Sequence, residues 1–233
     1  MNSTTIIPLL SALIPALALL GYIYWQDRKS PEPWHKLLKA TLLGVLAIPL
    51  TMCIVFPLQA IGIVPDSYNT FGDVVNFSFL GAAIPEELAK LLMLWLFLRK
   101  NPFFDERMDG IVYAVCVSLG FAGLENVMYV LGNTDWMSVA LLHAFTAVPG
   151  HFCYGVIMGY FYSLAKFDPK NRTKYSILAL VAPIIAHGIY DTIAFATTLP
   201  LVPEILLNIV FVVFCFLLWR WASKSIKKHL EMA

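Results

Sequence analysis

Two adjacent glutamates and a lysine lie in the stretch PEELAK (residues 85–90), inside a segment that is otherwise apolar. Glu86 and Lys90 are four residues apart, which places them on one face of a helix. Pro85 either breaks the preceding turn or begins a new helix, and in the second case the dipole of the first turn favours the carboxylates of Glu86 and Glu87. A buried pair that fixes helix register is the structural alternative, but one glutamate would suffice for it.

Three later segments contribute further ionisable groups. Glu125 lies in GFAGLENVMY, His151 follows a predicted Pro-Gly kink, and His187 and Asp191 are four residues apart in AHGIYDTI. A spacing of four suits a carboxylate that orients an imidazole, or two ligands on one helix face. Taken alone, Glu125 and His151 each fit a hydrogen-bonded packing residue as well as a functional group.

The free-energy cost of placing these charges in a membrane favours a functional role for them. A charged side chain in the middle of a bilayer costs about 2.5–3.5 kcal/mol, so the five charged groups Glu86, Glu87, Lys90, Glu125 and Asp191 would cost about 12–17 kcal/mol if they were independent. That is comparable with the whole stability of a typical fold, about 5–15 kcal/mol. We therefore expect the groups to be paired in a shared site.

Such a site has the groups that hydrolysis requires. A buried carboxylate can act as a general base toward water, and imidazoles can donate to an oxyanion, move protons or bind a metal. These are the parts needed to hydrolyse an amide within a membrane. The sequence contains neither G-x-S-x-G nor H-E-x-x-H, so serine hydrolase and gluzincin mechanisms lack support.

The composition requires a lipid environment for the elements that carry these residues. The 233 residues are 59% hydrophobic and 13% charged, with a mean hydropathy of +0.74. Soluble domains have about a quarter of their residues charged, so this exterior must face lipid. The net charge of +1 gives no reason to expect nucleic-acid binding.

The fold class that we predict is all-α: a polytopic transmembrane helix bundle forming a single integral membrane domain over residues 1–233. Seven apolar segments are long enough to cross about 30 Å of hydrocarbon. The sequence shows no internal repeat and no linker. The predicted segments are 6–25, 37–64, 74–98, 110–131, 137–165, 175–198 and 201–221.

The basic residues predict an orientation. Of the 16 Lys and Arg residues, all except Lys90 lie in or beside alternate connections between the segments. The positive-inside rule then places the N-terminus outside and the C-terminus in the cytoplasm, and the alternation favours seven spans.

Depth along the segments predicts where the polar groups meet. With a rise of about 1.5 Å per residue, Glu86, His151 and His187 lie about 16–21 Å below the outer surface. Glu125, His143 and Asp191 form a shallower tier at about 9–11 Å. We therefore expect an acid and two histidines from three helices at one level, with a second polar tier above them.

The motifs resemble those of the PrsW family of intramembrane proteases. PEELAK resembles its EExxK motif, FAGLEN its FxxxE motif, VPGHFCYGVIMGY its HxxxG segment and AHGIYDTI its HxxxD motif. DRKSPEP, in the first connection, resembles the D…EP feature of the family. The likeness covers about residues 25–196, and there is a more distant similarity to the CAAX prenyl protease and bacteriocin-processing superfamily.

This resemblance implies an intramembrane endopeptidase of glutamic or metal-dependent type. It implies that Glu86 and Glu87 hold the catalytic acid, that His151 and His187 are the essential histidines, and that Glu125 and Asp191 support them, with Lys90 tuning the glutamate pair. If a divalent metal such as zinc is bound, we expect His151, His187 and Glu125 as ligands. His143 stands where relatives would have an arginine-like position.

The same resemblance implies a membrane-anchored protein substrate, such as an anti-sigma factor, and a place in a prokaryotic cytoplasmic membrane. Two other classes of function remain open on the residues alone. A proton-coupled transporter uses similar Glu, His and Asp chains, although its usual inverted repeats are absent from the sequence. A non-catalytic binding protein could capture a partner helix in the same groove.

Overall fold

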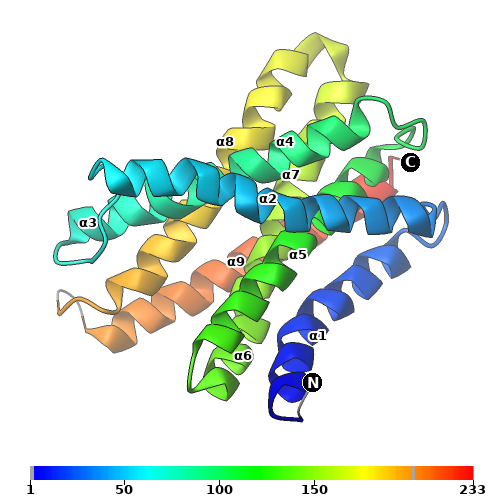
Figure 1. The fold of residues 1–233 in the computed structure, drawn as a ribbon. Helices are drawn as coiled ribbons and strands as arrows, with labels where there is room; N and C mark the ends of the chain where they lie inside the picture. Colours follow the sequence, from blue (N-terminus) through cyan, green and yellow to red (C-terminus); the bar gives the residue numbers. More distant parts are fainter. Residues whose placement is uncertain (1–2, 201–202, 233) are drawn as a thin grey trace.

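The computed structural model describes residues 3–200 and 203–232, and over these ranges the chain is helical and contains no strand. Figure 1 shows the helices crossing one another as long rods. The elements are α1 (Ser3–Gln26), α2 (Trp34–Ala60), α3 (Phe71–Asn76), the π-helix η1 (Phe77–Ala83), α4 (Ile84–Leu98), α5 (Arg107–Gly132), α6 (Trp136–Phe145), α7 (Ala147–Phe167), the short 3₁₀ turn η2 (Pro169–Asn171), α8 (Arg172–Ala196) and α9 (Glu204–Leu230).

The predicted all-α membrane bundle is confirmed, and six of the seven predicted segments are long and apolar enough to span a bilayer. The predicted segment 74–98 is the exception, because Glu86, Glu87 and Lys90 interrupt its apolar run. It is nevertheless helical throughout, as α3, η1 and α4 in succession. The last predicted segment starts at residues 201–202, which lie outside the described residues, and its helix α9 begins at Glu204.

The predicted fifth segment, 137–165, is not one helix. It divides into α6 and α7 at Thr146, whose backbone angles (φ −125°, ψ −72°) are not helical. Pro149 follows three residues later. A proline is tolerated near the start of a helix because the backbone N–H groups of the first turn have no acceptor within the helix, so the N–H that proline lacks is not needed there. Residues on the two sides of Thr146 therefore do not lie on one straight axis.

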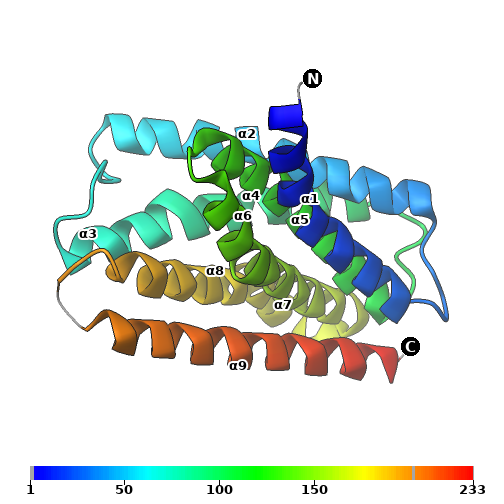
Figure 2. The ribbon, with the colours of Figure 1, turned by 90° about the horizontal axis from the view of Figure 1, so that it is seen from below.

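Helix α5 forms the centre of the molecule, and nearly every residue from Met108 to Gly123 is buried. Helices α1, α2 and α7 pack around it, as Figures 1 and 2 show from two directions. The approach of α7 is close at Gly159, where an added Cβ would lie 2.3 Å from the carbonyl oxygen of Gly110. Small residues at helix crossings let backbones come together in this way, as the Gly155 and Gly159 spacing predicts.

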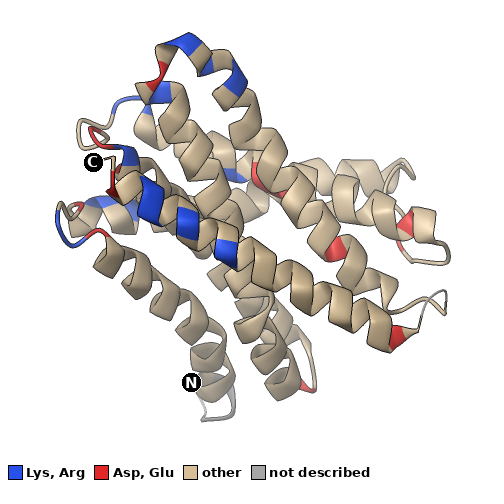
Figure 3. Cartoon of the chain, turned by 180° about the vertical axis from the view of Figure 1, so that it is seen from behind, with Lys and Arg blue, Asp and Glu red and all other residues tan. Residues whose placement is uncertain are grey.

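Basic residues gather at one end of the bundle. Figure 3 shows Lys and Arg concentrated on the connections that follow α1, α4 and α7 and on the C-terminal end of α9. The N-terminal end of α1 lies at the other end of the molecule (Figure 1). This asymmetry is the one on which the predicted orientation depends.

Candidate active site

The glutamate pair is positioned by an irregularity in the helix that carries it. Segment η1 is a π-helix, in which the N–H of Ile84 donates to the carbonyl of Phe79, five residues earlier. Pro85 follows in the first turn of α4, where its missing N–H is tolerated. Glu86 and Glu87 lie in that same turn, but the chain is already helical before it, so Pro85 follows a π-helical irregularity within a continuous helix and does not begin a separate one.

Lys90 ties the glutamates to a different helix. Its Nζ lies 3.2 Å from Oε2 of Glu86, 2.9 Å from Oε1 of Glu87 and 3.0 Å from Nδ1 of His151 on α7. An ammonium has three N–H donors and no acceptor, so these three partners satisfy it completely. The side chain of Lys90 is fully buried and also lies over the ring of Phe121, 4.0 Å from its centroid. Four interactions thus stabilise this buried cation.

The contact with Lys90 determines the protonation of His151. Because Nδ1 faces an ammonium, it must accept a hydrogen bond, and Nε2 therefore carries the ring proton. Nε2 lies 2.8 Å from Oε2 of Glu125 on α5, to which it donates. His151 is thus a neutral imidazole held between a cation and a carboxylate.

His187 on α8 closes the cluster from the other side. Its Nδ1 lies 2.9 Å from Oε1 of Glu87, and its Nε2 lies 3.3 Å from Oδ2 of Asp191, one turn along the same helix. The ring of Tyr154 stacks on this imidazole, with centroids 4.7 Å apart and planes inclined by 14°. Two carboxylates and one aromatic face thus set the position of the ring.

All seven sequence-predicted site residues converge in this buried cluster, to which α4, α5, α7 and α8 contribute. The two predicted tiers form one connected cluster: Asp191 contacts His187 from one turn away, as their spacing predicted, and Glu125 of the shallower tier bonds directly to His151 of the deeper one. Counting residues from the outer end of each segment overlooked the break at Thr146 and the tilt of the helices. His143, which the sequence placed in the shallower tier, lies outside the cluster. Its Nδ1 lies 3.1 Å from Oδ1 of Asn126 and its ring packs on Tyr129.

Tyr154 is the residue of this cluster that the sequence prediction missed. Its hydroxyl is buried and has no hydrogen-bond partner among the described residues. The available signal was its position three residues after His151, on the same face of α7. A tyrosine in an apolar helix is common, however, so spacing alone did not single it out.

The charges of the cluster favour a bound cation. Four carboxylates face one ammonium, so with neutral imidazoles three negative charges remain unbalanced in a buried site, which is costly. Glu86, Glu87, His151 and His187 each offer a ligand atom within 4.8 Å of the others. Oε2 of Glu87 is buried and unpartnered among the described residues. Carboxylate oxygens and imidazole nitrogens are ligands that zinc and other divalent metals accept, so these residues fit such an ion.

A second group of carboxylates lies at the basic end of the molecule, away from this cluster. The backbone N–H of Glu32 donates to Asp27, and the hydroxyl of Tyr113 on α5 donates to Glu32. Burial raises the pKa of Asp27 to about 7 and that of Glu32 to about 8. These are the acids of DRKSPEP, and they attach the first connection to α5.

Comparison with known proteins identifies the family. A family model described as PrsW family intramembrane metalloprotease matches residues 32–219. Protease PrsW of Bacillus subtilis (strain 168) is 38% identical over 184 residues, which is 78% of this chain and 80% of that protein. Protease PrsW of Clostridioides difficile (strain 630) is 30% identical over 226 residues, 95% of this chain and 91% of that protein. No solved structure gave a significant match. The chain, with its buried cluster of glutamates and histidines, belongs to the PrsW family of intramembrane metalloproteases.

Proposed function

We propose that this protease cleaves a membrane-anchored protein, such as an anti-sigma factor, and that the cluster around Glu86, Glu87, His151 and His187 is its active site. The observation that carries the proposal is the convergence of an acid pair, a lysine and two imidazoles in one buried cluster. A packing role for Glu86 and Lys90 alone would require neither histidine.

The two glutamates have different surroundings, and we assign them different roles. Glu87 is fully buried, and its Oε1 is shared by Lys90 and His187. Glu86 retains some exposure, and its hydrogen bond is to Lys90. Glu86 is therefore the general base, whereas Glu87 positions Lys90 and His187.

A divalent metal would be held by Glu87 and His187 with Glu86 beside it, and by Nδ1 of His151 only when Lys90 releases that nitrogen, and it would supply Lewis-acid polarisation of a carbonyl or of water. Glu125 bonds to the far nitrogen of His151 and so orients a ligand, a role in which a carboxylate is common. This differs from the ligand set that the sequence suggested, in which Glu125 bound the metal itself. Asp191 has the equivalent role at His187.

The reaction then follows from the positions of these side chains. Glu86 accepts a proton from the attacking water as its oxygen bonds to the carbonyl carbon of the substrate. Lys90 lies beside Glu86 and offsets the negative charge that develops on the carbonyl oxygen. The C–N bond breaks, and Glu86 returns the proton to the leaving amine, so that one water is consumed and a carboxylic acid and an amine are formed.

The test is cleavage of a single-pass substrate in proteoliposomes. Glu86→Gln should lower the rate by about 10²–10⁴-fold while the protein keeps its thermal stability, because a base is lost but Glu87 still binds Lys90. Metal content before and after treatment with a chelator should track activity. Full activity of Glu86→Gln would show that Glu86 is not the base. Activity in a preparation free of metal would show that the reaction needs no metal.

The remaining parts of the proposal concern topology. We propose that residues 1–233 form one membrane protease domain, that the N-terminus lies outside and the C-terminus in the cytoplasm, and that the membrane is the prokaryotic cytoplasmic membrane. The concentration of basic residues at one end supports this orientation. Cysteine accessibility at the α1–α2 and α8–α9 connections tests it, because the two should be labelled from opposite sides of the membrane.

A further inference from the structure

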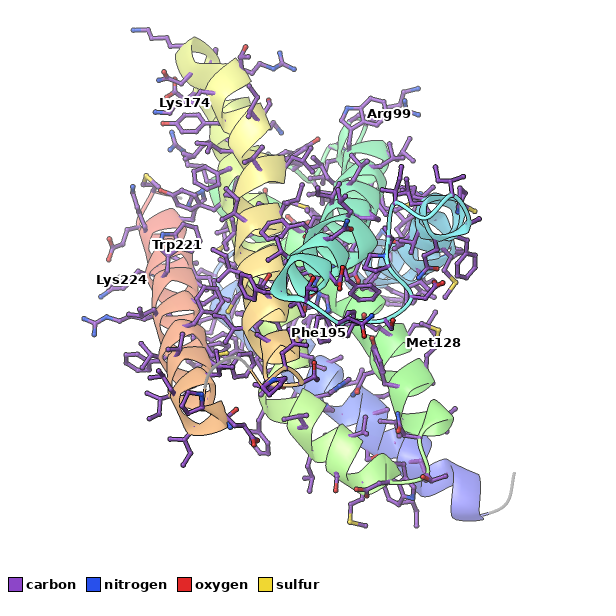
Figure 4. The ribbon with its side chains drawn as sticks, turned by 90° about the vertical axis from the view of Figure 1, so that its left-hand side faces the viewer. Arg99, Met128, Lys174, Phe195, Trp221 and Lys224 are labelled. Carbon is purple, nitrogen blue, oxygen red and sulfur yellow. The ribbon has the colours of Figure 1, made fainter. Side chains whose placement is uncertain are left out.

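Helices α4 and α8 meet at the active site and separate toward the basic end of the molecule. They are joined at the Glu87–His187 hydrogen bond. Figure 4 shows them diverging from there toward the labelled residues Arg99 and Lys174. The space between them is a groove of about 870 Å³. Its volume is within the range of pockets that hold small ligands, about 300–1,000 Å³.

The walls of this groove are apolar. Leu88, Leu91, Leu92 and Trp95 line one side from α4, and Ala179 lies opposite on α8. Trp95 is 45% exposed, so its ring is accessible to an occupant of the groove. An occupant that reaches this depth must therefore be apolar along most of its length.

The mouth of the groove is basic. Arg99, Lys100, Lys166 and Arg172 line it, and the residues that line the groove include no Asp or Glu. Arg99 lies over the Trp95 ring, 4.7 Å from its centroid, so the cation stands directly above the apolar wall. A soluble anion would contact only the basic mouth, and an uncharged apolar molecule would contact only the apolar walls. A molecule with an anionic head on apolar tails uses both.

We propose that this groove binds an anionic glycerophospholipid, with its phosphate between Arg99 and Arg172 and an acyl chain along Leu88, Leu92 and Trp95. Basic pockets between membrane helices select anionic head groups in this way. The site is separate from the hydrolytic chemistry, since none of its lining residues belongs to the Glu/His cluster. Its inner end nevertheless lies beside that cluster, because Leu88 follows Glu87 directly.

The experiment uses Trp95 as the reporter. The full-length protein is placed in phosphatidylcholine vesicles that contain either brominated phosphatidylglycerol or brominated phosphatidylcholine at the same mole fraction. The fluorescence of Trp95 is obtained as the difference between wild type and Trp95→Phe. We expect Trp95 to be quenched more strongly by the anionic lipid. Attraction to an anionic lipid surface is about fivefold per basic residue, so Arg99→Gln/Arg172→Gln should reduce the preference at least about fivefold.

Matched variants separate the groove from the charged end as a whole. Lys224→Gln/Lys227→Gln removes two exposed cations from α9 that do not line the groove, and should leave the preference intact; Figure 4 labels Lys224. Ser176→Phe narrows the groove from its exposed α8 side and should lower the quenching by both lipids. Circular dichroism and gel filtration check that each variant is folded.

Three outcomes would overturn the proposal. Equal quenching of wild-type Trp95 by the two lipids would show that the head group is not selected. An equal loss of preference in the Lys224→Gln/Lys227→Gln control would assign it to general surface charge. Weak quenching by both lipids would show that a protein segment or a second copy of the chain fills the groove.

Discussion

The Nζ atom of Lys90 lies 3.0 Å from Nδ1 of His151, and this contact joins α4 to α7 across the buried cluster. Because the ammonium can only donate, the contact fixes the tautomer of His151 and directs its N–H toward Glu125. A single lysine thus organises two glutamates on its own helix and one imidazole on another.

Removing that lysine should damage both stability and activity. Lys90→Met keeps an unbranched side chain, one atom shorter than that of lysine, but leaves Glu86 and Glu87 without their shared cation. Breaking a buried ion pair from one side costs about 3–5 kcal/mol, so we expect a clearly lower unfolding temperature in detergent and loss of cleavage. Wild-type stability together with wild-type cleavage would contradict the role assigned to Lys90.

Glu125 should act by orienting His151. In Glu125→Gln the amide oxygen can still accept from Nε2, whereas Glu125→Leu leaves that N–H unpaired. Loss of a partner that orients a ligand typically costs about 10–100-fold in activity or metal affinity, and we expect this for the leucine variant. The glutamine variant should recover most of it. Cleavage rate and metal affinity are the two measurements, and equal defects in both variants would point to the charge alone.

Tyr154 should position His187 through its ring. Tyr154→Phe keeps the aromatic face that stacks on the imidazole, whereas Tyr154→Leu removes it. We therefore expect near-normal cleavage from the phenylalanine variant and at least about 10-fold slower cleavage from the leucine variant. A large defect in Tyr154→Phe would instead assign the buried hydroxyl a direct contact with substrate.

The close crossing of α5 and α7 should not tolerate a side chain at Gly159. An added Cβ would lie 2.5 Å from Cα of Ile111, so Gly159→Ala should cost about 1–3 kcal/mol by overpacking. Gly21 in α1 is the matched control, since nothing lies within 4 Å of an added Cβ there. Gly21→Ala should be neutral or slightly stabilising. Thermal unfolding of both variants in the same detergent decides the point.

The carboxylates of the first connection should make stability depend on pH. Burial raises the pKa values of Asp27 and Glu32 to about 7 and about 8 in the folded protein, above their ordinary values near 4. Folding therefore favours their protonated forms, and this stabilisation is complete below pH 4 and lost as pH rises through about 7 and 8. Unfolding temperature should fall between pH 5 and pH 8.5, by about 2–4 °C for each kcal/mol lost. Asp27→Asn should weaken this dependence, and Asp66→Asn, at an exposed position, should not.

Local relationships were predictable from the sequence. The pairs Glu86–Lys90 and His187–Asp191 depend only on helical spacing, and both are in contact. The apolar segments also predicted the long helices, because the thickness of the hydrocarbon layer dictates the length of a membrane-spanning helix. The double glutamate was informative for the same reason, since an ionised side chain is costly in lipid unless it has a partner.

Contacts between helices were less predictable. Nothing in the spacing of α4 and α7 indicates that Lys90 reaches His151, or that Glu125 rather than Asp191 is the partner of that histidine. These depend on helix rotation and tilt, which the packing of small residues such as Gly159 sets. Pro149 and Gly150 predicted a kink in this segment, but the division into two helices at Thr146 was missed because the apolar run continues through it, and hydropathy does not report backbone angles.

The π-helical segment before Pro85 has an effect on helix phase. Successive residues of an α-helix are rotated by about 100° around its axis. The additional residue in the π-helical turn of η1 therefore rotates the side chains that follow it relative to those that precede it. Phe77 can thus pack on Tyr68 and Phe195 while Glu87 points at His187. Deleting a single residue from η1 would couple the two faces again, and either the aromatic packing or the acid pair would then turn away from its partners.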